Sequence, residues 1–439
     1  MLGNKAARKS LTFFMLKAAN TGLATLWSFL LAYSLVRIVG LESYAFFATV
    51  IAFASLILQA DLGISIRLFG QLRENYLHPE NGSRADLGSA VAAALWSYGA
   101  VAVLATIVFG ALLWVAELGV PAYRPIYLLL FAGSVLPLPW MVLRLAANAF
   151  DAYVLTEAID CVRRTLLLAL TGALVLGLPL MLYASSFVVL WLAGLVALFV
   201  VARRRLGFLS GARIGRGFRA LRADLHGIAA SAALSFSEFL ILIFPYYAIP
   251  LMHGEALALV AFDMFYKVTR FATTAYFTVT ETMLPHQTRA WHAGDAAALR
   301  RWTRLAFAIG AVPALAGGLV VGLFGDRFFG ILLGHPGVVS PGMRAAICVM
   351  LALMLVQVAS GMVLAGIGWL AALARRAALT LAAMLVFSVI TALQGWSIER
   401  FIAGYVFLYG CEAFSYLLLL RRLFREAEEK VPDGVPEGA

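Results

Sequence analysis

Four charged residues fall inside an apolar stretch, DMFYKVTRFATTAYFTVTETMLP, which spans residues 263–285. They are Asp263, Lys267, Arg270 and Glu281. At roughly 100° of rotation per residue, a helix places all four within a sector of about 60°. A charge held inside a bilayer costs a few kcal/mol and is normally retained for function. This charged face therefore predicts a functional site.

The chemistry of this face depends on how its charges balance. Asp263 lies four residues before Lys267, which is the favourable order for an ion pair on one helix. We expect this pair to neutralise itself and to leave Arg270 as an unbalanced cation that binds an anion. The alternative is that the cations reach the headgroups along their own side chains. At 1.5 Å per residue they lie roughly 16 to 21 Å from the outer end of the helix, which is too deep to do so comfortably.

Two weaker polar faces lie on other predicted helices. Glu238 falls near the middle of one helix, on the same side as Ser231 and Ser235, and a carboxylate at that depth needs a partner or a proton. Lys17 shares a side of the first helix with Asn20, although small polar residues also serve helix packing alone. The candidate site comprises the cavity cations Arg270, Lys267 and Lys17 and the charge-pair or coupling carboxylates Asp263, Glu238 and Glu281.

The whole chain has the composition of a membrane protein. Its 439 residues are 63% hydrophobic and 13% charged, whereas soluble domains are about half apolar and a quarter charged. Apolar stretches of about 20 residues, long enough to cross the hydrocarbon core, recur along it. We predict an all-α polytopic protein with transmembrane helices at 18–39, 43–66, 88–116, 125–147, 165–184, 186–202, 228–250, 256–284, 303–324, 341–366, 377–396 and 399–420. The fifth and sixth are nearly continuous, and only residues 183–186 mark a turn between them.

The basic residues predict topology and domains. Most lysines and arginines fall in alternate loops on the side of the N-terminus, which places both termini in the cytoplasm. The net charge of +11 then indicates contact with anionic lipid, with no nucleic acid as a partner. We predict an N-terminal six-helix lobe at 1–202, a basic cytoplasmic linker at 203–227, a C-terminal six-helix lobe at 228–420 and a disordered cytoplasmic tail at 421–439.

Several classes of function are disfavoured. The three cysteines offer no disulfide framework, and the six histidines show no ligand spacing. The short loops leave no room for a catalytic or nucleotide-binding domain. We therefore expect a protein that is not an enzyme, with no catalytic residue, no metal site and no cofactor.

Two short motifs add a resemblance. The first, VRIVGLESYAFF followed by ADLGISIR, contains Arg37, Gly40, Asp61 and Gly63. The second, MLPHQTRAWHAGD, contains Pro285 and, after it, Thr288 and the pair Gly294–Asp295. With these motifs the chain resembles the Wzx-type polysaccharide flippases of the multidrug/oligosaccharidyl-lipid/polysaccharide (MOP) exporter superfamily. In that family Arg37, Gly40, Asp61, Gly63 and Pro285 would be structural positions.

The resemblance implies a fold and a cargo. The two lobes would surround a cavity that opens alternately to each side of a bacterial inner membrane. The cargo would be an isoprenoid diphosphate carrying an oligosaccharide repeat unit, flipped from the inner to the outer leaflet for polysaccharide biosynthesis. Arg270 and Lys267 would hold the diphosphate, because arginine offers a planar fork and lysine a point charge. Membrane lipids, a polysaccharide polymerase and the chain-length machinery are the implied partners.

One alternative remains open, and two others are disfavoured. An ion-coupled drug or metabolite antiporter of the same superfamily would use Glu238, Asp263 or Glu281 as a proton or sodium site. A facilitator of the major superfamily normally has Gly-x-x-x-Asp-Arg in its second-to-third loop, which is absent from RLFGQLRENYLHPENGSRAD. A membrane glycosyltransferase would need a large outer loop with catalytic acids, and no such loop is predicted.

Overall fold

The computed structural model describes residues 2–61, 64–77, 84–223, 225–253 and 256–429. Within these ranges every regular element is a helix. The chain divides into two compact units, Met1–Phe239 and Leu240–Ala439, with the boundary inside α9. The prediction of an all-α polytopic protein is confirmed.

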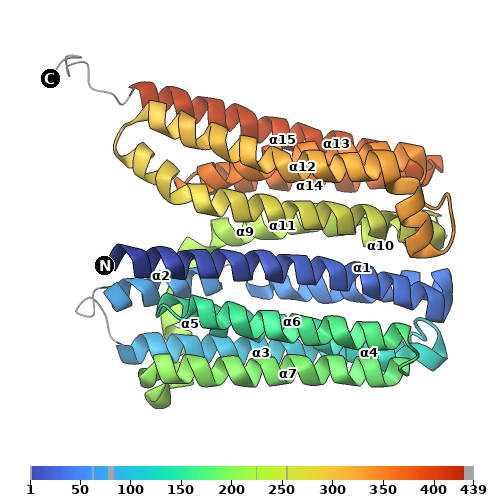
Figure 1. The fold of residues 1–439 in the computed structure, drawn as a ribbon, viewed down its shortest axis with the longest axis horizontal. Coiled ribbons are helices and arrows are strands. Elements are labelled where there is room, and N and C mark those ends of the chain that lie inside the picture. The colour runs from blue at the N-terminus through green and yellow to red at the C-terminus, as the bar shows by residue number, and fades with distance from the viewer. Residues whose placement is uncertain (1, 62–63, 78–83, 224, 254–255, 430–439) are drawn as a thin grey trace. The chain divides into compact units, whose positions relative to one another are not determined.

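Unit 1 is a helical bundle in which α6 packs against α1 and α7, and α3 packs against α4 and α5 (Figure 1). Its elements are α1 (Leu2–Ile57), η1 (Leu58–Asp61), α2 (Ile64–Leu77), α3 (Arg84–Val115), η2 (Pro121–Tyr123), α4 (Arg124–Val135), α5 (Pro137–Ala149), α6 (Tyr153–Val175), α7 (Leu180–Arg205), η3 (Gly207–Gly211), α8 (Ile214–Ala223) and most of α9 (Leu225–Ile243).

Unit 2 is a second bundle, built around α11, α12, α13 and α15. In it α11 packs against α12 and α13, and α13 also packs against α15. Its elements after α9 are α10 (Pro245–His253), α11 (Ala256–His292), α12 (Ala296–Leu333), α13 (Pro341–Gly366), α14 (Leu370–Gln394) and α15 (Ile398–Glu429).

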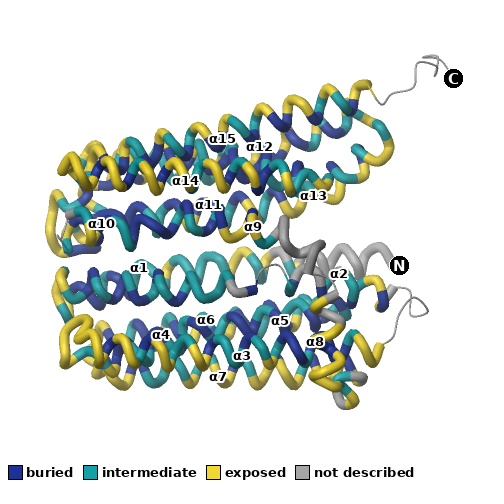
Figure 2. The backbone as a smooth tube through the Cα atoms, turned by 180° about the vertical axis from the view of Figure 1, so that it is seen from behind, coloured by how far each residue is buried: buried dark blue, intermediate teal, exposed yellow. Residues whose placement is uncertain are grey.

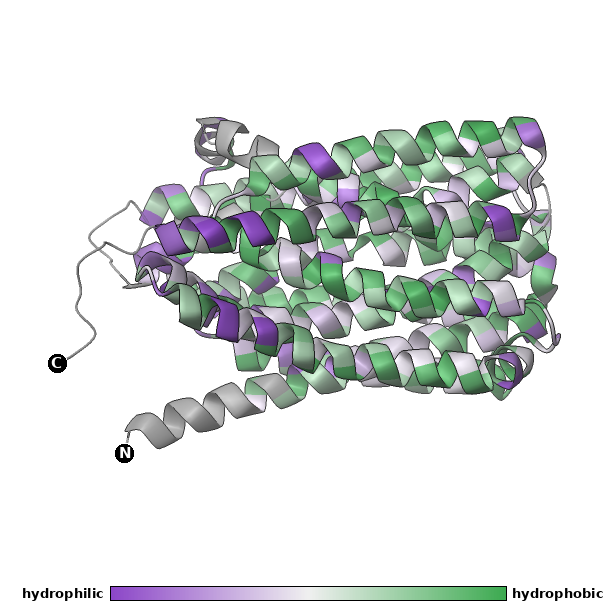
Figure 3. Cartoon of the chain, turned by 90° about the horizontal axis from the view of Figure 1, so that it is seen from above, coloured by the Kyte–Doolittle hydropathy of each residue, from purple (hydrophilic) through white to green (hydrophobic). Residues whose placement is uncertain are grey.

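The outer helix surfaces are apolar, as lipid-facing surfaces must be. Figure 2 shows exposed residues along α7 and α14, and they include Val189 and Val196 on α7 and Leu379 and Val386 on α14. Hydrophilic residues gather towards helix ends, whereas the helix middles are mostly hydrophobic (Figure 3). In the described part of the chain nine helices are long and apolar enough to cross a membrane. The charged helices α6 and α11 are not among these nine, and the predicted total of twelve stays a prediction.

The predicted boundary between the fifth and sixth spans is wrong. The turn lies at residues 176–179, between the end of α6 at Val175 and the start of α7 at Leu180. Gly177 adopts φ 104° there, and Pro179 precedes the first residue of α7. Tyr183, which was expected to mark the turn, is fully buried within α7. The apolar pattern placed the fifth span too late in the sequence, because the first part of α6 contains charged residues that neighbouring helices bury.

Two further helix ends differ from the prediction. The eighth span was expected to end at 284, but α11 continues through Pro285 to His292, and Gly294 then reverses the chain at φ 70°. The predicted tail begins at 421, yet α15 is helical to Glu429. Its extension is held by burial of Leu423 and by an ion pair between Arg300 and Glu428 at 2.5 Å. Residues 430–439 lie outside the described residues.

Residues 203–223, most of the segment 203–227 predicted as a linker, are folded within unit 1. They contain the end of α7, then η3 and α8, and both η3 and α8 pack against α3. The Ser89 hydroxyl on α3 accepts a hydrogen bond of 3.0 Å from the backbone N–H of Arg213. A Cβ at Gly217 would lie 2.0 Å from the carbonyl oxygen of Ser89, so only glycine allows α8 this close to α3.

Gly40 breaks α1 into two membrane-length parts. Its backbone has φ 78° and ψ 168°, a region that is essentially restricted to glycine. We expect Gly40→Ala to destabilise the protein by about 1–3 kcal/mol, measured as the shift in thermal unfolding in detergent. Gly22→Ala is the matched control in the same helix, because nothing lies within 4 Å of its added Cβ. Equal effects at the two positions would contradict the role given to the kink.

Candidate functional site

Helix α11 has one face packed in unit 2 and one face left open. Thr269, Thr273, Tyr276 and Thr280 are buried where α12 and α13 cover the helix. On the other side, the polar face of α11 consists of Lys267, Arg270, Thr274, Phe277 and Glu281, of which Arg270, Phe277 and Glu281 are exposed. The structure therefore places two of the three predicted cations, Lys267 and Arg270, along one side of α11.

Asp263 and Lys267 form the ion pair suggested by their spacing. Lys267 Nζ donates to Asp263 Oδ2, and Tyr246 on α10 donates to Asp263 Oδ1 at 2.6 Å. Asp263 is only 2% exposed. The carboxylate of Asp263 thus accepts hydrogen bonds from the ammonium of Lys267 and the phenol of Tyr246, and the second bond links α10 to α11. This arrangement suits a structural pair better than an ion-coupling carboxylate.

The pair can be tested by a double-mutant cycle. Asp263→Ala or Lys267→Ala alone leaves a charge without its counter-ion in a poorly solvated site. We expect each single variant to lose more stability than the double variant, with a coupling energy of about 1–3 kcal/mol. Thermal unfolding in detergent measures the cycle. Additive losses would show that the two side chains do not stabilise each other.

Arg270 is the cation that this arrangement leaves unbalanced. It lies less than one helical turn after Lys267 and is exposed. Among the residues that the structure describes, none forms an ion pair with Arg270. The neighbouring Phe271 and Phe277 are also exposed. A guanidinium can bind an anion through its planar fork.

The threonine hydroxyls of α11 donate hydrogen bonds to backbone carbonyl oxygens of the same helix. Thr274 donates to the carbonyl oxygen of Arg270 at 3.0 Å, and Thr278 donates to that of Thr274 at 2.9 Å. The same pattern recurs at Thr269, Thr273 and Thr280. Satisfied hydroxyls let a polar helix lie in an apolar environment. Arg270, rather than the threonines, therefore supplies the hydrogen-bond donors of this face that no described carboxylate pairs with.

The other predicted carboxylates and Lys17 lie in different surroundings. Glu281 is exposed on the polar face of α11, and Glu238 is half-buried on α9. Ser235 is exposed, and the side chain of Ser231 lies outside the described residues. Lys17 is half-buried on α1, where its carbonyl oxygen accepts from Thr21 at 3.0 Å. Their assignment to a cavity stays a prediction.

Arg37 and Asp61 of the first motif have structural contacts. Arg37 is exposed before the Gly40 break, with its guanidinium 4.1 Å from the ring centroid of Tyr33. Asp61 is buried and accepts from the N–H of Ser65 at 3.2 Å and from the phenol of Tyr98 at 2.7 Å. Gly63 lies outside the described residues. Pro285 lies within the range of α11 and is exposed.

Sequence reasoning missed a charged cluster in unit 1. On α6, Asp160 accepts from Arg163 Nε at 3.1 Å and from Arg164 Nε at 3.0 Å. Glu157, one turn earlier, pairs with Arg144 of α5. The side chain of Asn20 on α1 joins the two acids, donating to Glu157 at 3.1 Å and to Asp160 at 2.5 Å.

This unit 1 cluster is deeply buried. Glu157, Asp160 and Arg163 are at most 5% exposed. The guanidinium of Arg163 lies 3.6 Å from the centroid of the Trp191 ring on α7. The three arginines exceed the two carboxylates, so the cluster carries an excess positive charge. The spacing of Glu157, Asp160, Arg163 and Arg164 was a usable signal, but it was assigned to a loop because the fifth span was placed too late.

Comparisons with known proteins identify the fold. No protein-family model matches the chain, and no curated protein matches its sequence significantly. Solved structures do match over nearly the whole length. The eukaryotic multidrug and toxic compound extrusion (MATE) transporter AtDTX14 has a TM-score of 0.66 at 15% identity and covers 97% of this chain and 99% of its own.

Two microbial structures agree with this match. The Vibrio cholerae MATE transporter VcmN in its bent form gives a TM-score of 0.63 at 16% identity, covering 96% of this chain and 98% of its own. A MOP-superfamily transporter from Pyrococcus furiosus, described as having a binding pocket of reverse polarity that suggests a different function, gives 0.66 at 13% identity and covers 96% of both chains. The chain therefore has the fold of MOP-superfamily transporters.

Proposed function

We propose that this protein is a MOP-superfamily transporter that flips isoprenoid-diphosphate-linked oligosaccharides from the inner to the outer leaflet. The proposal rests on Arg270, an exposed cation of α11 without an ion pair among the described residues. A diphosphate crossing an apolar region needs such a cation, and arginine binds phosphate oxygens in a bidentate manner. The exposed Phe271 and Phe277 supply flat apolar surface beside it.

The energy source follows from the charge of the cargo. About two negative charges moving outward across an inside-negative membrane gain roughly 4–5 kcal/mol per 100 mV. This gain removes any need for ATP. Lys267 and Tyr246 engage the two oxygens of Asp263, which supports a structural role for this carboxylate rather than ion coupling.

The second candidate is an ion-coupled antiporter for drugs or metabolites. The MATE transporters that share this fold favour it, and the half-buried Glu238 would be its coupling carboxylate. A protonatable acid would bind and release a proton as the two cavity states alternate. Such an antiporter would move a soluble cation and would respond to an imposed pH gradient rather than to the charge of a lipid.

Deletion of the gene tests the proposed cargo in the cell. We expect a lipid-linked oligosaccharide to accumulate on the inner leaflet, and a plasmid copy of the wild-type gene to remove it. Extraction and mass spectrometry identify the lipid, and a membrane-impermeant glycan label reports its leaflet. Unchanged levels and distribution of every lipid-linked glycan would refute the flippase proposal.

A further inference from the structure

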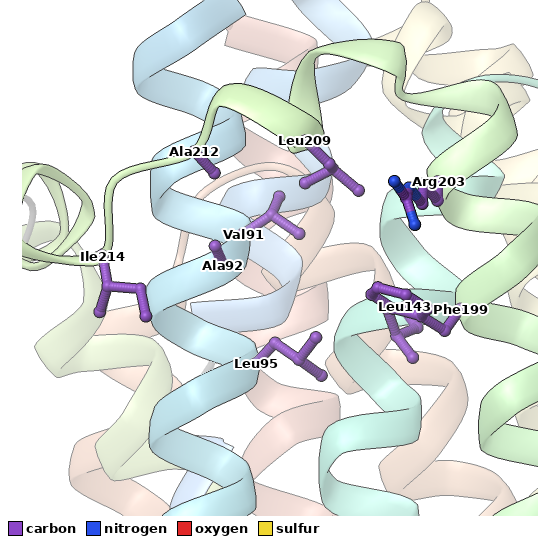
Figure 4. Close-up of a pocket in the computed structure, with 9 residues that line it drawn as sticks. All are labelled: Val91, Ala92, Leu95, Leu143, Phe199, Arg203, Leu209, Ala212 and Ile214. Carbon is purple, nitrogen blue, oxygen red and sulfur yellow. The ribbon is translucent and has the colours of Figure 1, made fainter.

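A pocket of about 290 Å³ lies at the arginine-rich end of unit 1 (Figure 4). Leu95 of α3, Leu143 of α5 and Phe199 of α7 form its inner walls. Leu209 of η3 and Ile214 of α8 close it from the segment after α7. Arg203 is its charged member, and Figure 4 shows it above Phe199 and Leu143, near Leu209. The pocket is thus an apolar space with a cation at its edge.

The surface around this pocket is strongly basic. Arg203, Arg204 and Arg205 end α7 and are all exposed. Further exposed arginines at positions 213, 216, 219 and 222 lie just before α8 and along it. Of these seven, only the arginine at position 216 has an ion pair with a described residue, Asp86 of α3, at 3.6 Å. The remaining positive charge is available to an anionic surface or ligand.

Helix α8 has the pattern of a helix that lies at a membrane interface. It is held to α3 at Gly217 and through the N–H of Arg213. Ile214 and Phe218, one turn apart, are apolar and exposed. A short helix of this kind lies at the interface with its exposed apolar residues in the acyl region and its arginines among the headgroups. The pocket therefore opens where lipid chains and phosphates meet.

We propose that this pocket binds one acyl chain of an anionic phospholipid, with the headgroup phosphate held by Arg203 and the arginines around α8. The volume is near the lower limit of about 300 Å³ for small-molecule pockets, which suits a single chain better than a bulky solute. Positive charge at the rim selects an anionic headgroup over a zwitterionic one. This site is separate from the polar face of α11 and does not depend on the proposed cargo.

A second groove provides the matched control. It lies on α3 alone and is lined by Trp96, Gly99, Val103 and Ile107 among others. None of the lining residues described there is charged. It represents ordinary lipid contact on the same helix, without a headgroup site. Val103→Trp adds bulk to this groove, just as Leu95→Trp adds bulk to the pocket.

Native mass spectrometry of the full-length protein tests the site with phosphatidylglycerol and phosphatidylcholine of identical chains. We expect wild type to prefer phosphatidylglycerol, and Leu95→Trp to abolish the preference by filling the pocket. Arg203→Gln should lower the affinity for phosphatidylglycerol about fivefold, the effect of one basic residue near an anionic surface. Val103→Trp should behave as wild type.

Three results would overturn the proposal. One is equal binding of the two phospholipids by wild type. Another is an Arg203→Gln variant that binds phosphatidylglycerol as tightly as wild type. Because Arg203 is exposed, this variant should fold, so the test holds even if Leu95→Trp does not fold. The third is displacement of phosphatidylglycerol by an equimolar isoprenoid diphosphate, which would make the pocket part of a cargo site.

Discussion

Arg270→Ala is expected to lower the rate of lipid-linked oligosaccharide export by about 10- to 100-fold, the range that corresponds to one lost hydrogen-bonded charge contact. The side chain is exposed and has no ion pair in the described part of the chain, so its removal breaks no packing pair. Expression and thermal stability should therefore stay near wild type. The assay is export in a deletion strain complemented with each variant at matched protein levels.

Two variants separate the role of Arg270 from a general loss of positive charge. Arg270→Lys keeps the charge but loses the planar fork, so we expect intermediate export. Arg400→Ala removes another exposed arginine of unit 2, at the start of α15, and should export normally. Normal export by Arg270→Ala, or equal losses in Arg270→Ala and Arg400→Ala, would remove the anion site from α11.

Asp160→Ala is expected to be the most destabilising substitution in unit 1, costing about 3–5 kcal/mol. Asp160 accepts hydrogen bonds from Arg163, Arg164 and Asn20, and Arg163 is itself only 5% exposed. Removing the carboxylate leaves a buried guanidinium without its counter-ion. Thermal unfolding in detergent, together with the yield of folded protein, measures the loss.

The matched control for Asp160 is a surface ion pair of the same unit. Asp151 lies 2.8 Å from Arg73, and both side chains are about one third exposed, at 36% and 35%. Surface pairs of this kind contribute about 0–1 kcal/mol. Asp151→Asn removes the charge but keeps a residue that tolerates the φ of 60° at this position, so it should barely change stability. If Asp160→Ala costs no more than Asp151→Asn, the unit 1 cluster does not stabilise the bundle.

Local signals in the sequence predicted much of the fold. Apolar length predicted the helices, since each span can be recognised without knowing its neighbours. The spans 18–39 and 43–66 left residues 40–42 between them, and the structure has its break there, at Gly40. The spacing of Asp263 and Lys267 predicted their ion pair, because residues four apart on a helix face each other.

The features that were missed depend on contacts between distant segments. Asn20 and Asp160 are 140 positions apart, and nothing in the sequence places them together. The charges of α6, which contacts with α1, α5 and α7 bury, caused its first part to be predicted as a loop. The pocket of unit 1 likewise combines residues of α3, α5, α7, η3 and α8, and it forms because the segment predicted as a linker packs against α3.

Flipping in reconstituted vesicles tests the central claim most directly. The purified protein is placed in vesicles with an isoprenoid-diphosphate oligosaccharide in one leaflet, and its transfer is followed with a membrane-impermeant glycan-binding probe. We predict transfer that accelerates under an imposed voltage, ignores an imposed pH gradient and falls about 10- to 100-fold in Arg270→Ala. Vesicles that leave the lipid in its original leaflet but exchange a soluble organic cation for protons would contradict the flippase and identify an antiporter.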